Sequence, residues 1–278
     1  MSVLRAFEFF QSVSKRSQSS TAGMQQVLHL DRRAISQAID DAGPLPSLAA
    51  IVIDHALTTL RLLVKGIRYR QWGQAACEAY RQMTPAQFAA INGRQAWANW
   101  RTIPRSLNGR LPIDRPLTVV DLCCGTGEST RVLAWWLPSG SRIIAYEQDP
   151  RFVEVAAKKF YFNRQGNLIP VTVHWASVLD GFVQKDGNFL ADNSVDVVHV
   201  IGSLSCHFPL GDSRIIIQET ERVLAPGGLA FMDAGRRGTS PRDLIDLATK
   251  AGFHVEGESR SWLGDCSVQM ALRKPNPS

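Results

Sequence analysis

The spacing of hydrophobic positions changes near residue 117. From there onward, short apolar runs alternate with segments in which apolar residues recur every three or four positions. This alternation predicts strands and helices in turn, and therefore a mostly parallel sheet with helical crossovers. The expected elements are strands near residues 117–122, 142–147, 171–176, 195–201 and 229–233, and helices near 128–137, 150–164 and 212–224.

The end of the chain predicts an antiparallel addition to that sheet. Ser240 and Pro241 form a cap and first-turn pair for a helix that Gly252 ends. Residues 254–260 and 266–273 then predict a terminal hairpin. The expected fold class is therefore α/β, a Rossmann-like, seven-stranded, mostly parallel sheet with a C-terminal antiparallel hairpin.

The residues before 117 show helical spacing, and they predict an α-helical N-terminal region (residues 1–116) ahead of a cofactor-binding domain (residues 117–278). The expected helices cover residues 3–15, 23–41, 47–65, 69–83 and 85–100. Residues 101–116, with three prolines and Asn108-Gly109, predict the linker. Segment 47–65 contains Asp54, His55 and Arg61, which indicates a buried helix and no membrane span.

Composition and charge narrow the class of protein. The 278 residues are 45% hydrophobic and 20% charged, as in ordinary soluble globular proteins. The five cysteines show no metal-binding spacing, which favours reduced thiols, a cytoplasmic location and no metal site. The first 20 or so residues, with few acids, are typical either of a targeting segment or of a lid helix.

The net charge of +6 lies in the N-terminal region. Residues 1–116 hold 15 Lys and Arg against 7 Asp and Glu, a balance of +8, and the remainder holds 16 against 18, a balance of −2. An anionic partner such as RNA would explain this basic region. Solvated helix faces explain it as well, because the residues are mostly isolated arginines.

A glycine-rich turn follows the first strand of the predicted sheet. Cys123 to Gly127 lie between the apolar run and the next helix, a strand–loop–helix unit that suits a nucleotide. Asp121, just before the turn, would balance a cationic ligand or cap the loop. Glu147 ends the next apolar run about 20 residues on, where a carboxylate binds ribose hydroxyls. A ribose with a positive charge indicates S-adenosylmethionine.

Four motifs in order resemble the class I S-adenosylmethionine-dependent methyltransferases. They are Asp121 to Gly127, Tyr146 to Pro150, Asn193 to Val198, and Glu221 to Leu229. Cys123 stands where the family usually has glycine. The resemblance covers residues 117–274 and implies a set of cofactor-binding residues: Asp121, Cys123, Gly125, Thr126, Gly127, Glu147, Gln148, Ser177, Val178 and Ile201. Ser177 stands where the family often has an acid that faces adenine.

The resemblance also implies a substrate site. His207 follows the fourth strand, at the edge of the sheet where ligands bind, and is the candidate general base. The candidate substrate-contacting residues are Tyr69, Trp72, Trp97, Trp100 and Asp233, with the N-terminal region as a lid. A loop histidine with an ordinary hydrogen bond, and aromatic residues in a helix core, would produce the same patterns.

The expected function is methyl transfer to O, N or C of a small-molecule acceptor, plausibly in secondary metabolism, with S-adenosylhomocysteine as product. An RNA methyltransferase and a non-catalytic protein that binds the cofactor are the alternatives. The terminal hairpin disfavours a nicotinamide dehydrogenase. The acceptor and the oligomeric state are not predicted, because substrate pockets are built from loops that vary independently of cofactor motifs.

Overall fold

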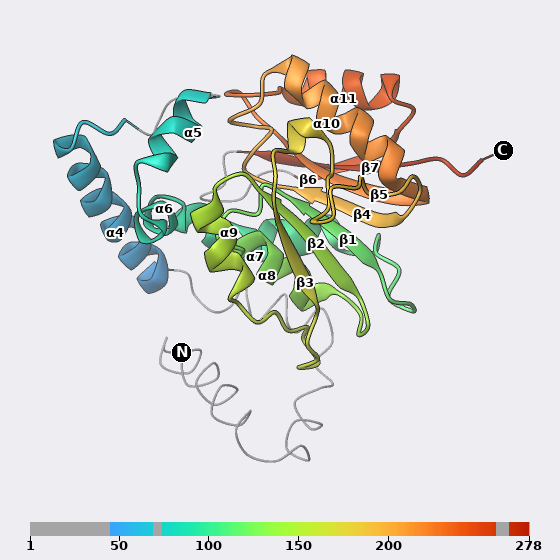
Figure 1. Ribbon diagram of the computed structural model, residues 1–278, viewed down its shortest axis with the longest axis horizontal. Coiled ribbons are helices and arrows are strands. Elements are labelled where there is room, and N and C mark those ends of the chain that lie inside the picture. The colour runs from blue at the N-terminus through green and yellow to red at the C-terminus, as the bar shows by residue number, and fades with distance from the viewer. Residues whose placement is uncertain (1–44, 69–73, 260–266, 278) are drawn as a thin grey trace, which may run out of the picture.

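A seven-stranded sheet forms the centre of the computed structural model, which describes residues 45–68, 74–259 and 267–277 (Figure 1). The strand order is β3-β2-β1-β4-β5-β7-β6. Strands β1 to β5 pair in parallel, and β7 is antiparallel to both β5 and β6. This confirms the predicted fold class. The strands are β1 Thr118–Leu122, β2 Arg142–Glu147, β3 Val171–Trp175, β4 Val195–Val200, β5 Leu224–Ala234, β6 His254–Ser259 and β7 Val268–Arg273.

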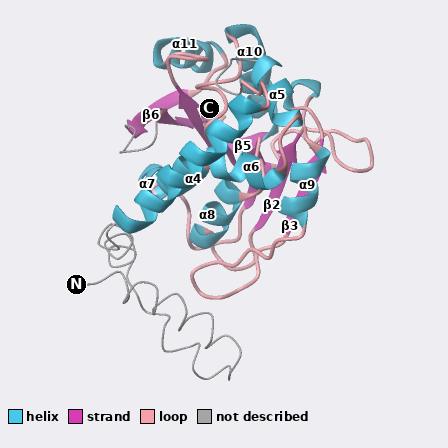
Figure 2. Cartoon of the chain, turned by 90° about the vertical axis from the view of Figure 1, so that its left-hand side faces the viewer, coloured by secondary structure: helices cyan, strands magenta, loops and turns pink. Residues whose placement is uncertain are grey.

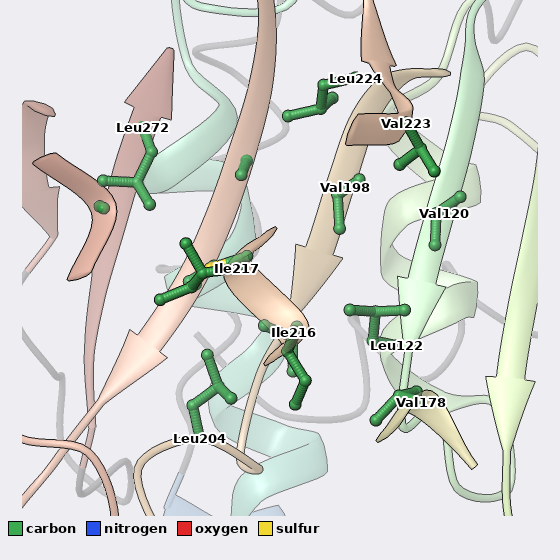
Figure 3. Packing of buried hydrophobic residues seen from close by; sticks show 14 of the residues in the cluster. Val120, Leu122, Val178, Val198, Leu204, Ile216, Ile217, Val223, Leu224 and Leu272 are labelled. Carbon is green, nitrogen blue, oxygen red and sulfur yellow. The ribbon is translucent and has the colours of Figure 1, made fainter. Parts of the chain in front are cut away.

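Helices cover both faces of the sheet, because successive residues of each strand point to opposite faces. One face packs against α7 (Gly93–Leu107), α8 (Glu128–Trp136) and α9 (Pro150–Ala157). The other packs against α10 (Leu210–Val223), α11 (Pro241–Lys250) and the short 3-10 helix η2 (Val178–Asp180). Figure 3 shows the second core, in which Ile216 and Ile217 of α10 meet Val198 of β4.

The strand order reverses next to β1. The chain builds outward from β1 through β2 to β3, and then returns to place β4 on the other side of β1. In such sheets, ligands bind at the carboxyl ends of the strands where the order reverses. The carboxyl ends of β1, β2 and β4 are therefore the place to look for a site.

Three helices precede the sheet: α4 (Leu45–Val64), α5 (Gln74–Arg81) and α6 (Pro85–Ile91). Helix α4 packs on α6 and α7, and α6 reaches α9 (Figure 2). Thr84 caps α6 in a reciprocal pair with Gln87. These contacts bring the N-terminal helices to the side of the sheet that carries α9.

Two features of the N-terminal region differ from the prediction. The helix expected over 85–100 is broken at Asn92, whose side chain donates to the Phe88 carbonyl and so caps α6. The linker expected from residue 101 begins only after Leu107, because α7 continues through Pro104. Ile103 and Leu107 are buried against α8 and the sheet, and this burial outweighs the cost of a proline inside a helix.

Two elements of the sheet domain also have different bounds. Helix α9 ends at Ala157, seven residues earlier than expected, because Tyr161 turns into the core and its hydroxyl donates to the Ala156 carbonyl. Strand β5 begins at Leu224 instead of 229, and its pairing with β4 shifts register between Val195 and Val197. Neither change moves the carboxyl ends of β1, β2 and β4.

Several predictions lie outside the described residues, namely the helices over 3–15 and 23–41, the targeting or lid segment, Tyr69, Trp72 and Cys266. Within the described ranges, no helix combines the length and the apolarity that crossing a bilayer requires. The same ranges contain no cluster of three His, Cys, Asp or Glu side chains suited to holding a metal ion.

Candidate active site at the carboxyl ends of the strands

The glycine loop between β1 and α8 turns back sharply on itself. Gly125 and Gly127 have φ of 55° and 89°, in the left-handed region that favours glycine. A Cβ atom at Gly127 would lie 2.2 Å from the Tyr161 hydroxyl, so no side chain fits there. The Gly127 N–H donates to the Cys124 carbonyl over 2.9 Å, which closes the turn.

Cys123 also has a positive φ, 55°, which L-residues with a Cβ rarely adopt. This explains why glycine is the usual residue at this position in the family that the sequence resembles. Burial raises the pKa of the Cys123 thiol, and the charge of Glu147 raises it further. The sulfur is therefore a neutral thiol at pH 7 and a poor nucleophile.

Glu147 lies directly beside the glycine loop, at the end of β2. One carboxylate oxygen accepts the Gly125 N–H and the other accepts the Asp149 N–H, each over 2.9 Å. Burial raises the pKa of Glu147, and these N–H groups oppose that effect. The carboxylate is fixed in direction and can accept further hydrogen bonds.

A pocket of about 360 Å³ opens next to this carboxylate. Its lining combines the β2–α9 turn with one side of α5: Cys77, Tyr80, Arg81, Glu147, Gln148, Asp149, Pro150, Arg151 and Phe152. The Gln148 side chain donates to the Cys77 sulfur over 3.1 Å, which links the two walls. The N-terminal region therefore contributes to the same pocket as the sheet.

Helices α5 and α6 are held over the loop by Arg151 of α9. Its guanidinium donates to the carbonyls of Met83 and Tyr80, over 2.6 and 3.1 Å, and pairs with Asp149 over 2.5 Å. The Phe88 ring of α6 packs on Phe152, with ring centres 4.1 Å apart. It also lies 3.2 Å from where a Cβ on Gly125 would be, so it covers part of the loop.

His207 faces this cover from the loop after β4. Its Nε2 lies 3.4 Å from the Tyr80 hydroxyl, and the two rings meet edge to face. Its Nδ1 is buried without a hydrogen-bond partner among the described residues. Burial lowers the pKa of His207 to about 4, so the ring is neutral at pH 7. A neutral imidazole with a low pKa is a weak base.

Asp121 is buried beneath the loop and turned away from the pocket. One oxygen accepts the hydroxyls of Ser129 and Thr130, over 3.0 and 2.7 Å, and the other lies 3.0 Å from His199 Nδ1. The opposite ring nitrogen of His199 lies 3.2 Å from the Gln269 side-chain nitrogen of β7. The geometry therefore favours the capping role over direct contact with a cation.

Other residues expected at the cofactor are mostly buried. Val178 packs in the core (Figure 3), Ile201 lies in the core on the α7–α8 side, and Thr126 is buried within the loop. The Ser177 hydroxyl caps η2 by accepting the Leu179 N–H. Their side chains do not line the pocket beside Glu147, because the hydrophobic core and the loop itself enclose them.

Three of the expected substrate residues, Asp233, Trp97 and Trp100, make structural contacts in the described part of the chain. Asp233 is fully buried, and its carboxylate accepts the N–H groups of Ser203, Leu204 and Ser205. Trp100 meets Trp135 of α8 edge to face. Trp97 stacks under the Arg101 guanidinium, which lies 3.8 Å from the ring centre. These side chains stabilise the loop after β4 and the α7–α8 packing.

Phe88, Tyr80 and Arg151 belong to the cover over the glycine loop and the pocket, and no sequence pattern predicted a place in the site for any of them. Phe88 and Tyr80 lie at ordinary helical core positions, and only their packing against α9 reveals their place. For Arg151 the sequence did give an indication, because this arginine follows Asp149 and Pro150 at the start of the helix predicted over 150–164. Nothing in that run shows that its partners are carbonyls of another helix.

Comparison with known proteins agrees with this geometry. Residues 119–228, which include the glycine loop, Glu147 and the loop after β4, match the methyltransferase domain family. This part of the chain is a methyltransferase domain, similar to those of the class I S-adenosylmethionine-dependent methyltransferases. The resemblance seen in the four sequence motifs is thereby confirmed.

Curated relatives of this methyltransferase domain are thiol S-methyltransferases called TMT1B. The rat protein is 26% identical over 188 residues, which is 68% of each chain. The human protein is 27% identical over 158 residues, 57% of this chain and 59% of the human one. The chain thus spans between about three fifths and two thirds of their length.

Solved structures share the fold of this chain. A putative methyltransferase from Haloferax volcanii, solved with the Trm112 activator, aligns with a TM-score of 0.52 and 18% identity over 69% of this chain and 96% of its own. A Leishmania major S-adenosylmethionine-dependent methyltransferase aligns with a TM-score of 0.51 and 16% identity over 69% of this chain and 79% of its own.

Proposed function

We propose that this chain methylates a small thiol with S-adenosylmethionine as the methyl donor. The main observation behind the proposal is the position of Glu147. Its carboxylate is buried, accepts two backbone N–H groups, and lies between the glycine loop and a pocket that a helical cover partly encloses.

The residues present fit the nucleoside part of S-adenosylmethionine. The Glu147 carboxylate provides the acceptors that a ribose diol needs, and it lies on the pocket wall. Gly125 and Gly127 leave the loop without side chains that would hold a ligand away. When bound, S-adenosylmethionine supplies an activated methyl group, and S-adenosylhomocysteine is the product.

The cover favours a small acceptor. Tyr80 and Phe88 lie over the loop, and Arg151 ties their helices to α9. A flat macromolecular surface would have to displace this cover to reach the loop. A small molecule needs only the space beside Tyr80 and Cys77, where the side chains can orient it and exclude water.

The chemistry near the cover favours a thiol. An alcohol has a very high pKa and requires a strong base, whereas a thiol ionises near pH 8.5. His207, with a pKa of about 4, is too weak a base to ionise an alcohol, whereas a thiol can lose its proton to water and react as the thiolate. The curated relatives are named thiol S-methyltransferases, which supports the same acceptor.

The test measures S-adenosylhomocysteine formed by the purified chain with a panel of acceptors. The panel contains an alkyl thiol, an aryl thiol, a phenol, a primary amine and total RNA. We expect turnover with the thiols and little with the others. Preferential turnover of RNA or of the phenol would overturn the proposed acceptor. Binding of S-adenosylhomocysteine without turnover on any acceptor would favour the non-catalytic alternative.

The donor site has a separate test in Glu147→Gln. An amide cannot accept from both backbone N–H groups and the ribose as a carboxylate does. We expect the dissociation constant for S-adenosylhomocysteine, measured by calorimetry, to rise about tenfold or more, as loss of hydrogen bonds to a charged group implies. The control is Glu154→Gln, an exposed acid of α9 that pairs with Lys158. Equal affinities in the two variants would exclude Glu147 from the donor site.

A further inference from the structure

Strand β3 forms one edge of the sheet, and within the described part of the chain it pairs with β2 alone. The other edge is β6, on the opposite side of the molecule (Figure 2). Edge strands present unpaired backbone N–H and C=O groups, which proteins commonly protect with charged side chains or bulges. Strand β6 is protected in this way, because it contains Glu256, Gly257 and Glu258 and its register shifts between Val255 and Gly257.

Strand β3 has neither form of protection. Its pairing with β2 is regular, and it contains no Asp, Glu, Lys, Arg or Gly. Its residues are mostly β-branched or aromatic, the types that strands favour: Val171, Thr172, Val173, His174 and Trp175. A regular, uncharged edge of this kind is suited to pairing with a further strand.

Two hydrogen bonds show which residues of β3 direct their backbone groups outward. The Pro170 carbonyl accepts the Ile143 N–H, and the Ala176 N–H donates to the Glu147 carbonyl. Because successive residues of a strand direct their backbone groups to opposite sides, the even-numbered residues face β2. The residues whose N–H and C=O groups face the open edge are therefore Val171, Val173 and Trp175.

We propose that a second copy of this chain pairs with that edge, β3 against β3, in an antiparallel arrangement with two-fold symmetry. Two identical strands run antiparallel when the two-fold axis is perpendicular to the sheet. An axis through Val173 places this residue opposite its own copy, and Val171 opposite Trp175 of the second copy. Each outward-facing residue then meets an outward-facing residue, so the free N–H and C=O groups of both strands bond to one another.

The side chains at this edge also complement one another. Val171 and Trp175 lie on the same face of the sheet as Val173. The Trp175 residue is 69% exposed, and its indole N–H donates to the Gln148 carbonyl, which holds the ring in place. In the paired strands the ring packs on Val171 of the second copy. Cross-strand pairs of an aromatic and a β-branched side chain stabilise a sheet.

Exposed apolar side chains lie in the segments on both sides of β3. Phe162 and Leu168 form a bridge before the strand, and Phe189 belongs to a similar bridge after it. Antiparallel pairing brings the beginning of one strand beside the end of the other. The apolar groups before β3 therefore approach those after β3 of the second copy, and their burial favours association.

Helix α9 fits this pairing in distance and in charge. It packs over β2 and β3, and its Ala156 shares a small buried cluster with Val173. With strands about 4.8 Å apart, the two α9 helices lie about 10 Å apart, which is an ordinary distance between packed helices. Because the axis passes near Ala156, the exposed Glu154 of each copy comes beside the exposed Lys158 of the other, and opposite charges meet.

Sedimentation velocity of the full chain over a range of concentrations tests the proposal, together with hydrogen exchange in residues 170–176. We expect a dimer, and exchange in 170–176 that slows as the concentration rises. Trp175→Lys puts a charge opposite Val171 and should raise the dimer dissociation constant about tenfold or more. Thr172→Lys, at an exposed side chain of β3, should weaken the dimer as well. The control is Ile245→Lys, an exposed apolar position on α11, which packs on β6 at the other edge.

Three results would overturn the proposal. A chain that stays monomeric at every concentration would exclude the pairing. Protection of 170–176 that does not depend on concentration would assign the edge to another part of the same chain. A dimer that both lysine variants leave unchanged would have its interface elsewhere. Circular dichroism checks that each variant is folded, and if Trp175→Lys is not, Thr172→Lys decides. The proposal does not depend on the acceptor, so it holds or fails independently of thiol methylation.

Discussion

At the level of single residues, the glycine loop contains one residue, Cys123, whose backbone conformation is energetically unfavourable. Cys123 keeps a side chain at φ of 55°, a conformation that costs an L-residue about 1–2 kcal/mol. Such strain persists only where the surroundings hold it, and here β1 and the turn that ends at Gly127 do so. The residue therefore occupies a fixed place between Glu147 and the loop after β4.

His207 predicts a dependence of stability on pH. Its pKa is about 4 when folded and about 6.5 when unfolded, so the unfolded state binds the proton more strongly. The contribution of His207 is complete above pH 6.5 and is lost as the pH falls towards 4, with about 2 kcal/mol lost between pH 7 and pH 5. His207→Gln should lose less stability than the wild type over that range.

Urea unfolding at pH 7 and pH 5 measures the effect of His207. Every other titrating group is common to the two proteins, so the difference between their losses isolates the histidine. An equal loss in both proteins would show that the imidazole titrates in the folded state as it does in water.

At the scale of elements, the cover of the pocket depends on one contact between helices. Arg151 of α9 donates to the Tyr80 carbonyl at the end of α5 and to the Met83 carbonyl just beyond it. The free carbonyls at the C-terminus of a helix attract a cation such as this guanidinium. Phe88 and Phe152 add an aromatic contact between α6 and α9. These contacts position α5 and α6, whose own short lengths give them little independent stability.

Arg151→Lys should loosen the cover without unfolding the sheet, because a lysine cannot donate to two carbonyls and a carboxylate in the same geometry. We expect hydrogen exchange in residues 74–91 to become about tenfold faster, while β1 and β4 keep their protection. Lys158→Gln, an exposed change on the same helix, serves as control. Unchanged exchange in residues 74–91 would show that aromatic packing alone holds the cover.

At the scale of the whole molecule, Asp121 connects parts of the chain that are far apart in sequence. It joins β1 to α8 through Ser129 and Thr130, and to β4 through His199, which in turn reaches Gln269 of β7. The network is buried, so each member depends on the others for its hydrogen bonds.

Asp121→Ala should lower the free energy of unfolding by about 3 kcal/mol, because it leaves buried polar groups without partners. Asp186→Ala, in an exposed loop, is the control and should change stability by less than about 0.5 kcal/mol. Urea unfolding followed by circular dichroism measures both. A variant as stable as the wild type that no longer binds S-adenosylhomocysteine would instead support direct contact of Asp121 with the cofactor.

The fold followed from the amino-acid sequence alone, and the sequence also predicted where a nucleotide would bind. Apolar periodicity defined each strand of the sheet to within a few residues, because strands and helices bury side chains at different, local intervals. Three residues indicated that place: Gly125, Gly127 and Glu147. The sharp turn of the loop requires glycine, and a ribose requires a carboxylate at the end of the next strand.

The direction in which each polar side chain points became clear only from the three-dimensional packing. Asp121 and Asp233 carry the same charge as Glu147, but hydroxyls, His199 and backbone N–H groups enclose them, whereas Glu147 lines a pocket. Phe88 packs on Phe152, and Arg151 donates to the Met83 carbonyl, each across more than 60 residues of sequence. Direction and long-range contact depend on how helices pack across the sheet, which local spacing does not specify.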